Sequence, residues 1–299
     1  MSANSTRSAR ALGDDISGWF NRHWAGNMGA VDGNDITFLK ALIDELKPKN
    51  FVEIGCASGL STSMLAMMLN RHGQASIHSF DLMETFYADP TKKLGYLLQD
   101  ALPHDQVRVN IHPSCTSLDV PKHLSSPVDM CFIDAAHVHP WPLIDTLAVL
   151  HLMRPGSVIV QHDLQMYKGA GGYALGPKIL HDQLTEAELV RLADKVHPGD
   201  VGTLKTRQID NNIYAIRVPE DKSDLVRRLC DGFYVGWDRR PKKGVGPAFA
   251  ARFSAFMLET YGEEAQAAFD VGAARYNPWQ PPPPPFHKRA YRKLRKMIG

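Results

Sequence analysis

The sequence has little cysteine, no long apolar run and almost no net charge, and each of these shortages excludes a class of protein. Its four cysteines, Cys56, Cys115, Cys131 and Cys230, stand far apart and form no Cys-x-x-Cys pair. This spacing argues against a disulfide framework or a zinc ribbon, and it fits a reducing, cytoplasmic compartment. The longest purely apolar stretch, MLAMML at 64–69, is too short to cross a bilayer.

The few excess charges are unevenly placed. The chain has 34 basic and 32 acidic residues, but residues 286–299 hold six of the bases and no acid. The remaining body is mildly acidic and shows no general nucleic-acid footprint, so no nucleic-acid partner is expected. Residues 1–20 lack the apolar segment of a signal peptide, and Asp14 and Asp15 interrupt them. Nothing in the sequence indicates an oligomeric state.

Apolar segments of strand length alternate with segments of helical spacing through the middle of the chain. Strands are predicted at 51–55, 75–81, 107–112, 128–135 and 156–163, and helices at 35–50, 60–73, from about Pro142, and near 174–193. Residues 201–219 predict a closing antiparallel hairpin around Asp210. Strands separated by helices indicate an α/β fold, with a doubly wound, mainly parallel sheet and helices on both faces.

Composition divides the chain into four parts. An N-terminal extension (1–34) precedes the α/β domain (35–219), and a helical extension (220–276) precedes a polyproline spacer with a basic tail (277–299). Bases alternate with apolar residues of helical spacing in the tail at 286–299. A solvated basic end explains this pattern, because one short helix is marginal alone, and peripheral contact with an anionic membrane or an acidic partner is the alternative.

A glycine-rich turn follows the first predicted strand in FVEIGCASGLST. Gly55 and Gly59 let the backbone turn tightly and approach a ligand closely. Asp81 ends the next predicted strand, where an acid can accept the hydroxyls of a ribose. A plain turn and a solvated acid explain each feature alone, but together they favour a nucleoside-bearing cofactor. Ala57 stands where a dinucleotide fingerprint has its second glycine, which argues against a dinucleotide.

Two acids and a histidine follow the ends of two other predicted strands. Asp134 and Asp163 are expected to lie side by side, because parallel strands end at the same edge of a sheet. Paired carboxylates suit Mg²⁺ or another hard divalent cation, and His137 nearby suits proton abstraction near neutral pH. Helix capping and ordinary loop contacts are the alternatives. His139, His162 and His181 are weaker candidates.

Four segments, VEIGCASGLST, SFD, DMCFIDAAHVHP and LMRPGSVIVQHD, resemble in order and spacing the class I S-adenosylmethionine-dependent methyltransferases. More narrowly, they resemble the branch of catechol O-methyltransferase-like enzymes and macrolide-sugar O-methyltransferases. The resemblance covers about residues 35–218 and implies a Rossmann-like sheet of seven strands, the last antiparallel. It implies that Glu53, Gly55 and Gly59 line the cofactor.

By the same resemblance, Asp81 holds the cofactor's ribose and Ser114 lies near its adenine. Asp134 and Asp163 would bind the divalent metal, and His137 occupies the position of the catalytic base. Catechol-type members usually carry an amide directly after the second acid, where this chain has Leu164.

The expected activity is O-methyl transfer from S-adenosylmethionine to a hydroxyl of a small molecule, a sugar or a glycoconjugate, with assistance from a divalent metal. Two alternatives stay open at this point. One is an NAD-dependent dehydrogenase on a similar sheet, and the other is a non-catalytic scaffold that keeps the methyltransferase fold.

Overall fold

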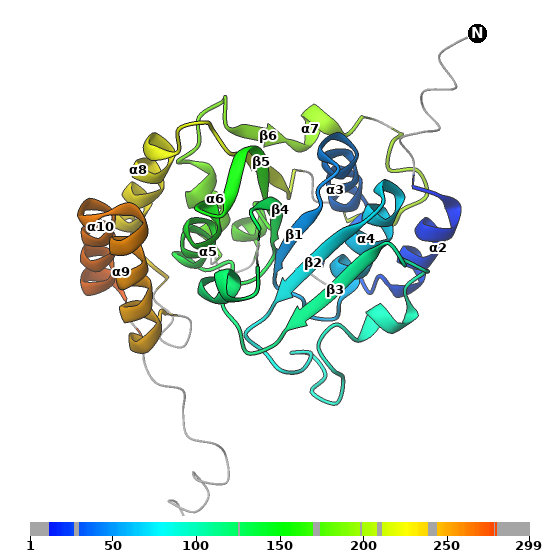
Figure 1. Cartoon of the computed structure of the whole chain (residues 1–299), viewed down its shortest axis with the longest axis horizontal. Helices are drawn as coiled ribbons and strands as arrows, with labels where there is room; N and C mark the ends of the chain where they lie inside the picture. Colours follow the sequence, from blue (N-terminus) through cyan, green and yellow to red (C-terminus); the bar gives the residue numbers. More distant parts are fainter. Residues whose placement is uncertain are drawn as a thin grey trace, which may run out of the picture.

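The predicted alternation of strands and helices is present in the computed structural model, which describes residues 12–26, 30–124, 126–169, 174–197, 199–207, 211–238, 244–277 and 279. Within these residues, seven strands form one sheet in the order β3-β2-β1-β4-β5-β7-β6 (Figure 1). The strands are β1 (Asn50–Ile54), β2 (Ala75–Phe80), β3 (Val107–His112), β4 (Val128–Ile133), β5 (Met153–Gln161), β6 (Leu189–Arg191) and β7 (Tyr214–Arg217).

The sheet has the seven strands and the antiparallel last strand expected of a Rossmann-like methyltransferase fold. Strands β3, β2, β1, β4 and β5 run parallel, and β7 runs antiparallel to both of its neighbours. The fold prediction is therefore confirmed. Because the parallel strands share a direction, the loops after β1, β2, β4 and β5 all leave from the same edge, where a ligand site is expected.

Helices cover both faces of the sheet (Figure 1). The α-helices are α2 (Asp14–His23), α3 (Gly33–Leu46), α4 (Leu60–Leu69), α5 (Trp141–Leu150), α6 (Gly176–His181), α7 (Leu192–Lys195), α8 (Ser223–Asp231), α9 (Pro247–Tyr261) and α10 (Glu263–Tyr276). Short 3-10 turns lie at Asn70–His72, Tyr96–Asp100, Ser117–Lys122, Met166–Lys168 and Gly232–Tyr234. One apolar core joins the sheet to α2, α3 and α4, and the other joins it to α5 and the C-terminal helices.

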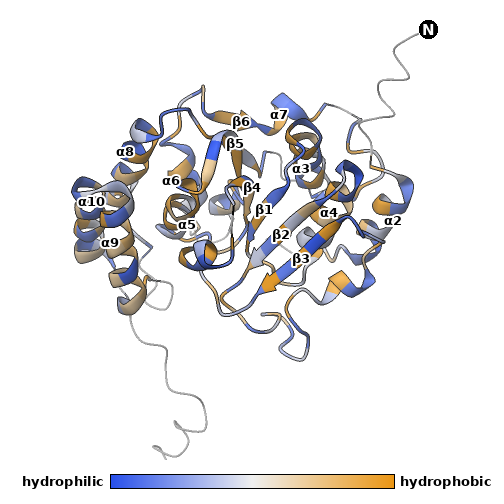
Figure 2. Cartoon of the chain, viewed as in Figure 1, coloured by the Kyte–Doolittle hydropathy of each residue, from blue (hydrophilic) through white to orange (hydrophobic). Residues whose placement is uncertain are grey.

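The C-terminal helices α8, α9 and α10 form an outer layer beyond α5. Their packing centres on Phe233, Phe253 and Phe269, whose ring centroids lie 4.8 to 6.2 Å apart in edge-on contacts. This layer explains why α5 is apolar on nearly every side, since a helix enclosed by the sheet and by other helices has no face in water. Figure 2 shows apolar residues gathered around α5, whereas α7 at the outside is largely hydrophilic.

Two predictions near the end of the sheet are wrong. The helix expected near 174–193 ends at His181, and β6 follows it at Leu189–Arg191. The hairpin partner of β7 is therefore β6, and residues 201–207 do not form a strand. The backbone of that segment binds the start of α3 instead, where Gly33 N–H donates to the carbonyl of Lys205 at 2.8 Å. Asp210 lies outside the described residues.

The basic tail at 286–299 also lies outside the described residues, so both the solvated end and the contact with a membrane or an acidic partner stay predictions. Among the described residues, no helix is both long enough and apolar enough to span a bilayer.

Candidate active site

The loop after β4 and the turn after β1 meet at the carboxyl edge of the sheet. The N–H of Asp134 donates to the carbonyl of Ile54 at 2.9 Å, which joins the two loops. Gly55 has φ +102°, and a Cβ there would lie 2.1 Å from the carbonyl oxygen of Asp134. Any larger residue at this position would push the two loops apart. Gly55 thus brings Asp134 against the turn that the sequence assigns to the cofactor.

The predicted acids and His137 come together at this edge. Nε2 of His137 lies 3.3 Å from Oδ1 of Asp134 and 3.1 Å from Oδ2 of Asp163. His162, a weaker candidate from sequence, lies directly behind them, with Nδ1 3.1 Å from Oδ1 of Asp134. Nε2 of His162 lies 2.9 Å from Oδ2 of Asp35. We call these five residues, Asp35, Asp134, His137, His162 and Asp163, the acid–imidazole group.

Charges within the acid–imidazole group stabilise one another. Burial lowers the pKa of His162, but the carboxylates of Asp163, Asp134 and Asp35 outweigh it and hold that pKa well above its ordinary value. Burial raises the pKa of Asp134, but His162 and His137 outweigh it and hold the pKa below the ordinary range. Both shifts favour a protonated His162 beside an ionised Asp134. The two ring nitrogens of His162 then donate in opposite directions, one toward Asp134 and the other toward Asp35.

An amide reaches Asp163 from elsewhere in the chain. Leu164, which stands where catechol-type enzymes usually carry an amide, is buried. Nδ2 of Asn212 donates to Oδ1 of Asp163 at 2.8 Å, and Oδ1 of Asn212 accepts from the N–H of Gln165 at 3.0 Å. The second bond fixes which way the amide faces. Asn212 therefore holds Asp163 in place by donating a hydrogen bond to it.

The residues fit a divalent cation at Asp134 and Asp163. Oδ2 of Asp163 is buried, and Nε2 of His137 lies 3.1 Å from it without completing a hydrogen bond. Carboxylate oxygens of Asp134 and Asp163 lie within 4.8 Å of each other, and His162, which donates from both nitrogens, would stay outside the coordination shell. Asp32 and Arg207 adjoin the group through Asp35. Two carboxylates that meet at one point suit a hard divalent cation.

A cavity of about 470 Å³ opens at this edge of the sheet. Asp134, His137 and the turn from Gly55 to Ser58 are among the residues that line it. Aromatic and apolar side chains complete the wall, contributed by Phe86, Tyr87, Tyr96, Leu97 and Met166. Residues at the end of α2 and just before α3, among them His23, Ala25 and Val31, also face the cavity. The N-terminal extension thus forms part of the site, which the sequence did not predict.

The other residues predicted to bind the cofactor surround the turn rather than fill the cavity. Asp81 accepts hydrogen bonds from the N–H groups of Cys56 and Ala57 at 3.1 and 3.0 Å, so it holds the turn. Gly59 starts α4 at φ +84°, and a Cβ there would lie 2.8 Å from the Cα of Gly95. Ser114 is exposed, and its hydroxyl donates to Glu84 at 3.0 Å.

Glu53 lies fully buried beneath the turn. Its carboxylate accepts hydrogen bonds of 2.6 Å from the hydroxyls of Ser61, Thr62 and Ser79. Burial raises its pKa to about 7, although the three hydroxyls oppose the shift. In this geometry Glu53 ties the first turn of α4 to β1 and β2, and so supports the cofactor turn from below.

His139 and His181 lie away from the acid–imidazole group. The ring of His139 packs edge-on against Trp237, 6.5 Å between centroids, where the loop after β4 meets the C-terminal helices. His181 makes a similar edge-on contact with Tyr214. Both are packing residues in this structure, and His139 is 3% exposed.

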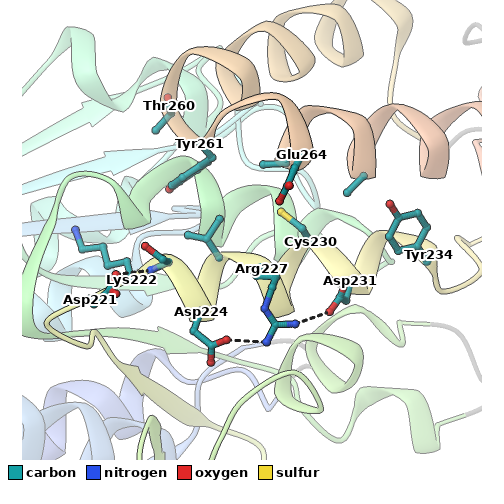
Figure 3. A pocket seen from close by; sticks show the side chains of 14 residues that line it. Asp221, Lys222, Asp224, Arg227, Cys230, Asp231, Tyr234, Thr260, Tyr261 and Glu264 are labelled. Atoms are coloured by element: carbon teal, nitrogen blue, oxygen red, sulfur yellow. Dashed lines mark hydrogen bonds and ion pairs between the residues drawn. The ribbon is translucent and has the colours of Figure 1, made fainter.

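A larger cavity, about 790 Å³, lies between α8 and the turn from α9 to α10 (Figure 3). Its walls carry several acids, but Arg227 pairs there with Asp224 and with Asp231, and these charges offset one another. None of the acid–imidazole group lines it. The smaller cavity, which the strand-end residues face, is therefore the candidate active site.

Asp35, Arg207 and Asn212 are site residues that the sequence analysis missed. Each lies far along the chain from its partner in the site, Asp35 from His162, Arg207 from Asp35 and Asn212 from Asp163, and only the fold brings them together. The one local signal was the pattern Asp-x-x-Asp at 32–35, which forms the capping box of α3.

The chain was compared with family models, curated proteins and solved structures. A family model described as a methyltransferase domain matches residues 52–164. The structure of the O-methyltransferase TomG from Streptomyces achromogenes, in complex with SAM, is 18% identical over 72% of this chain and 94% of its own, with a TM-score of 0.46. An O-methyltransferase from Bacillus cereus, in complex with SAH, is 18% identical over 72% of this chain and 96% of its own, also with a TM-score of 0.46. No curated protein matches the chain.

Likeness to solved structures at this level carries no argument about chemistry, so the family match is the informative comparison. The matched residues include most of β1, all of β2 to β5, and the strand-end residues Asp134, His137 and Asp163. The methyltransferase family model therefore matches the central strands of the Rossmann-like sheet, over less than half of the chain.

Proposed function

We propose that the protein transfers the methyl group of S-adenosylmethionine to a hydroxyl of a small molecule, a sugar or a glycoconjugate. One observation carries the proposal. An imidazole, His137, lies between two strand-end carboxylates, Asp134 and Asp163, and faces a cavity that the glycine turn also lines. The family match to a methyltransferase domain supports methyl transfer over hydride transfer, and Ala57 in the turn agrees with that choice.

In the proposed reaction, the acceptor oxygen attacks the methyl carbon, the carbon–sulfur bond breaks, and its electron pair stays on sulfur as S-adenosylhomocysteine forms. The sulfonium methyl is already activated, so the protein has to align the two reactants and exclude water. The turn from Gly55 to Gly59 would hold the methionine end of the cofactor and Asp81 its ribose. The aromatic wall of Phe86, Tyr87 and Tyr96 would shield the reacting atoms.

His137 would remove the proton of the acceptor hydroxyl. When its Nε2 donates to Oδ1 of Asp134, Nδ1 carries the lone pair that accepts this proton. Asp134 and Asp163 would then stabilise the imidazolium that forms. The same two acids would hold a divalent cation, which when bound lowers the pKa of a coordinated hydroxyl.

The test combines binding and turnover. Calorimetry should show S-adenosylhomocysteine binding with a Kd on the micromolar scale, about −7 to −8 kcal/mol. Incubation with methyl-labelled S-adenosylmethionine and a panel of phenols, sugars, glycosides and polyketide alcohols should give a labelled ether, identified by mass spectrometry. Binding without transfer to any acceptor would favour the non-catalytic scaffold, and binding of NAD instead would favour a dehydrogenase.

A further inference from the structure

His162 occupies the centre of the acid–imidazole group and has no contact with water. Its side chain is 0% exposed. Nδ1 lies 3.1 Å from Oδ1 of Asp134 and 3.5 Å from Oδ1 of Asp163, so one nitrogen faces both strand-end acids. A histidine without room to rotate fixes the acids that it contacts, provided that its other nitrogen is itself held.

Asp35 holds that other nitrogen. Oδ2 of Asp35 lies 2.9 Å from Nε2 of His162, and the carboxylate is 3% exposed. The same oxygen accepts the N–H of Asp32 at 2.8 Å and faces Nη2 of Arg207 at 3.3 Å. Three groups from different parts of the chain therefore converge on Oδ2 of Asp35.

Asp35 and Arg207 both lie outside the residues that match the methyltransferase family model, which begin at Val52 and end at Leu164. The family match therefore gives neither of them a role. Helix capping explains the bond from Asp32 to Asp35, because the two residues form the capping box of α3. Capping does not explain why the carboxylate also reaches a fully buried imidazole at the end of β5.

We propose that Asp35 is a positioning residue for methyl transfer, holding His162 and through it setting Asp134 and Asp163 on either side of His137. This inference rests on the proposed function. Asp35 belongs to the first turn of α3, directly after the segment that lines the cavity with Ala30 and Val31. The contact therefore also ties the cavity wall before α3 to the acids at the ends of β4 and β5.

The chain offers a matched control in Asp32. Both acids take part in the capping box, and both contact Arg207, but only Asp35 contacts His162. Asp35→Ala should lower kcat about 10-fold to 100-fold while the KM for S-adenosylmethionine stays within about twofold, as expected for a residue that orients other groups. Asp32→Ala should leave kcat within about threefold. Asp35→Asn, which keeps an oxygen to cap α3 and to accept from His162, should restore part of kcat.

A second readout requires neither acceptor nor cofactor. In the ¹⁵N-labelled wild-type protein, a ring N–H signal of His162 should be visible by NMR, because the buried ring exchanges slowly with water. Asp35→Ala should shift or abolish this signal, whereas Asp32→Ala should leave it in place. Circular dichroism and thermal unfolding of each variant identify any loss of fold.

Two results would overturn the proposal. One is equal kcat for folded Asp35→Ala and Asp32→Ala, which would leave Asp35 a capping role only. The other is an unchanged His162 ring signal in Asp35→Ala. Failure of the proposed function would look different, because the wild-type protein would then transfer no methyl group or bind no S-adenosylhomocysteine, while the ring signal would still report the contact.

Discussion

Two sets of histidines on the same sheet have neighbours of opposite kinds. In the acid–imidazole group, His162 faces three carboxylates, and these raise its pKa against the effect of burial. The second set, which we call the histidine cluster, consists of His78, His112 and His123 at the β2–β3 side of the sheet. Nδ1 of His78 lies 3.1 Å from Nε2 of His112, and the ring centroids of His112 and His123 lie 4.1 Å apart.

In the histidine cluster, burial and the neighbouring imidazoles both lower the pKa of His78 and of His112. Burial, His123 and His78 lower the pKa of His112 to about 4. Burial, His123 and Arg108 also lower the pKa of His78. The residue type alone therefore does not indicate a reactive site. Carboxylates at the carboxyl end of the sheet favour the charged form of His162, whereas burial and neighbouring imidazoles favour the neutral form of His78 and of His112, which stacks on Phe80.

Removing an imidazole from the acid–imidazole group should have the largest effect on activity. We expect His137→Ala to lower kcat by ~10²–10⁴-fold, because the group that takes the hydroxyl proton is lost. The affinity for S-adenosylhomocysteine should change little. Steady-state kinetics with an acceptor from the panel, together with calorimetry, measure both quantities.

The matched control removes an imidazole from the histidine cluster. His78→Ala should leave kcat within about twofold, since its ring contacts His112 and Asn110 and not the acids. A near-wild-type rate for His137→Ala at neutral pH would show that His137 is not the base, and that carboxylate neighbours do not identify a catalytic imidazole in this protein.

Removing a divalent cation should have the next largest effect. Excess EDTA is expected to reduce turnover about 10-fold to 100-fold, and added Mg²⁺ or Mn²⁺ should restore it. The reason is that chelation would remove the cation that Asp134 and Asp163 hold and that activates the acceptor hydroxyl. Turnover is measured before chelation, after it and after metal addition. Full activity in EDTA would mean that Asp134 and Asp163 act through hydrogen bonds and hold no divalent cation.

A smaller effect is expected at Asp81. Asp81→Ala should weaken S-adenosylhomocysteine binding by about tenfold, or about 1.4 kcal/mol, because the ribose loses its acceptor and the N–H groups of Cys56 and Ala57 lose theirs. Asp89→Ala, at an exposed acid in the following loop that bonds to Thr91, is the control and should bind as wild type. Equal affinity in both variants would exclude Asp81 from the cofactor site. Calorimetry at matched ionic strength makes the comparison.

The sequence was informative where the signal is local. Short apolar runs followed by Gly55, Asp81, Asp134 and Asp163 predict strands and the edge where they end, because every parallel strand presents its carboxyl end to the same side. The adjacency of Asp134 to Asp163 follows from this pattern when consecutive strands lie side by side, and the structure brings the two acids together.

Contacts between distant segments were not predictable in this way. Asp35 looks like an ordinary helix-capping acid, and Arg207 lies in a segment that was expected to form a strand. Asn212 supplies an amide to Asp163 from the residues before β7, so the position of Leu164 misleads when only neighbours in sequence are compared. Periodicity also failed at β6, since a strand of three residues carries too little pattern to recognise.

The smallest expected effect concerns stability in the histidine cluster. The pKa of His112 is about 4 in the folded protein, below its usual value of 6.5, so the unfolded chain binds a proton more readily between these two values. Lowering the pH from 6.5 to 4 should therefore destabilise the folded protein through this residue, with no further loss below about 4. Because the ring is partly exposed, solvent screening limits the effect to about 1 kcal/mol, or about 2 to 4 °C in Tm.

His112→Gln removes the titrating ring and should flatten this part of the Tm profile. The groups facing His112, namely His78 and His123, remain in the variant, so the difference between the two profiles isolates one ring. His104→Gln, outside the cluster, is the control and should keep the wild-type slope. The acids of the acid–imidazole group do not obscure the result, since the pKa of Asp134 lies below this window and the same residues are present in every variant. A His112→Gln profile parallel to that of the wild-type protein would mean that the cluster does not exclude charge, and the contrast with His162 would then rest on the carboxylates alone.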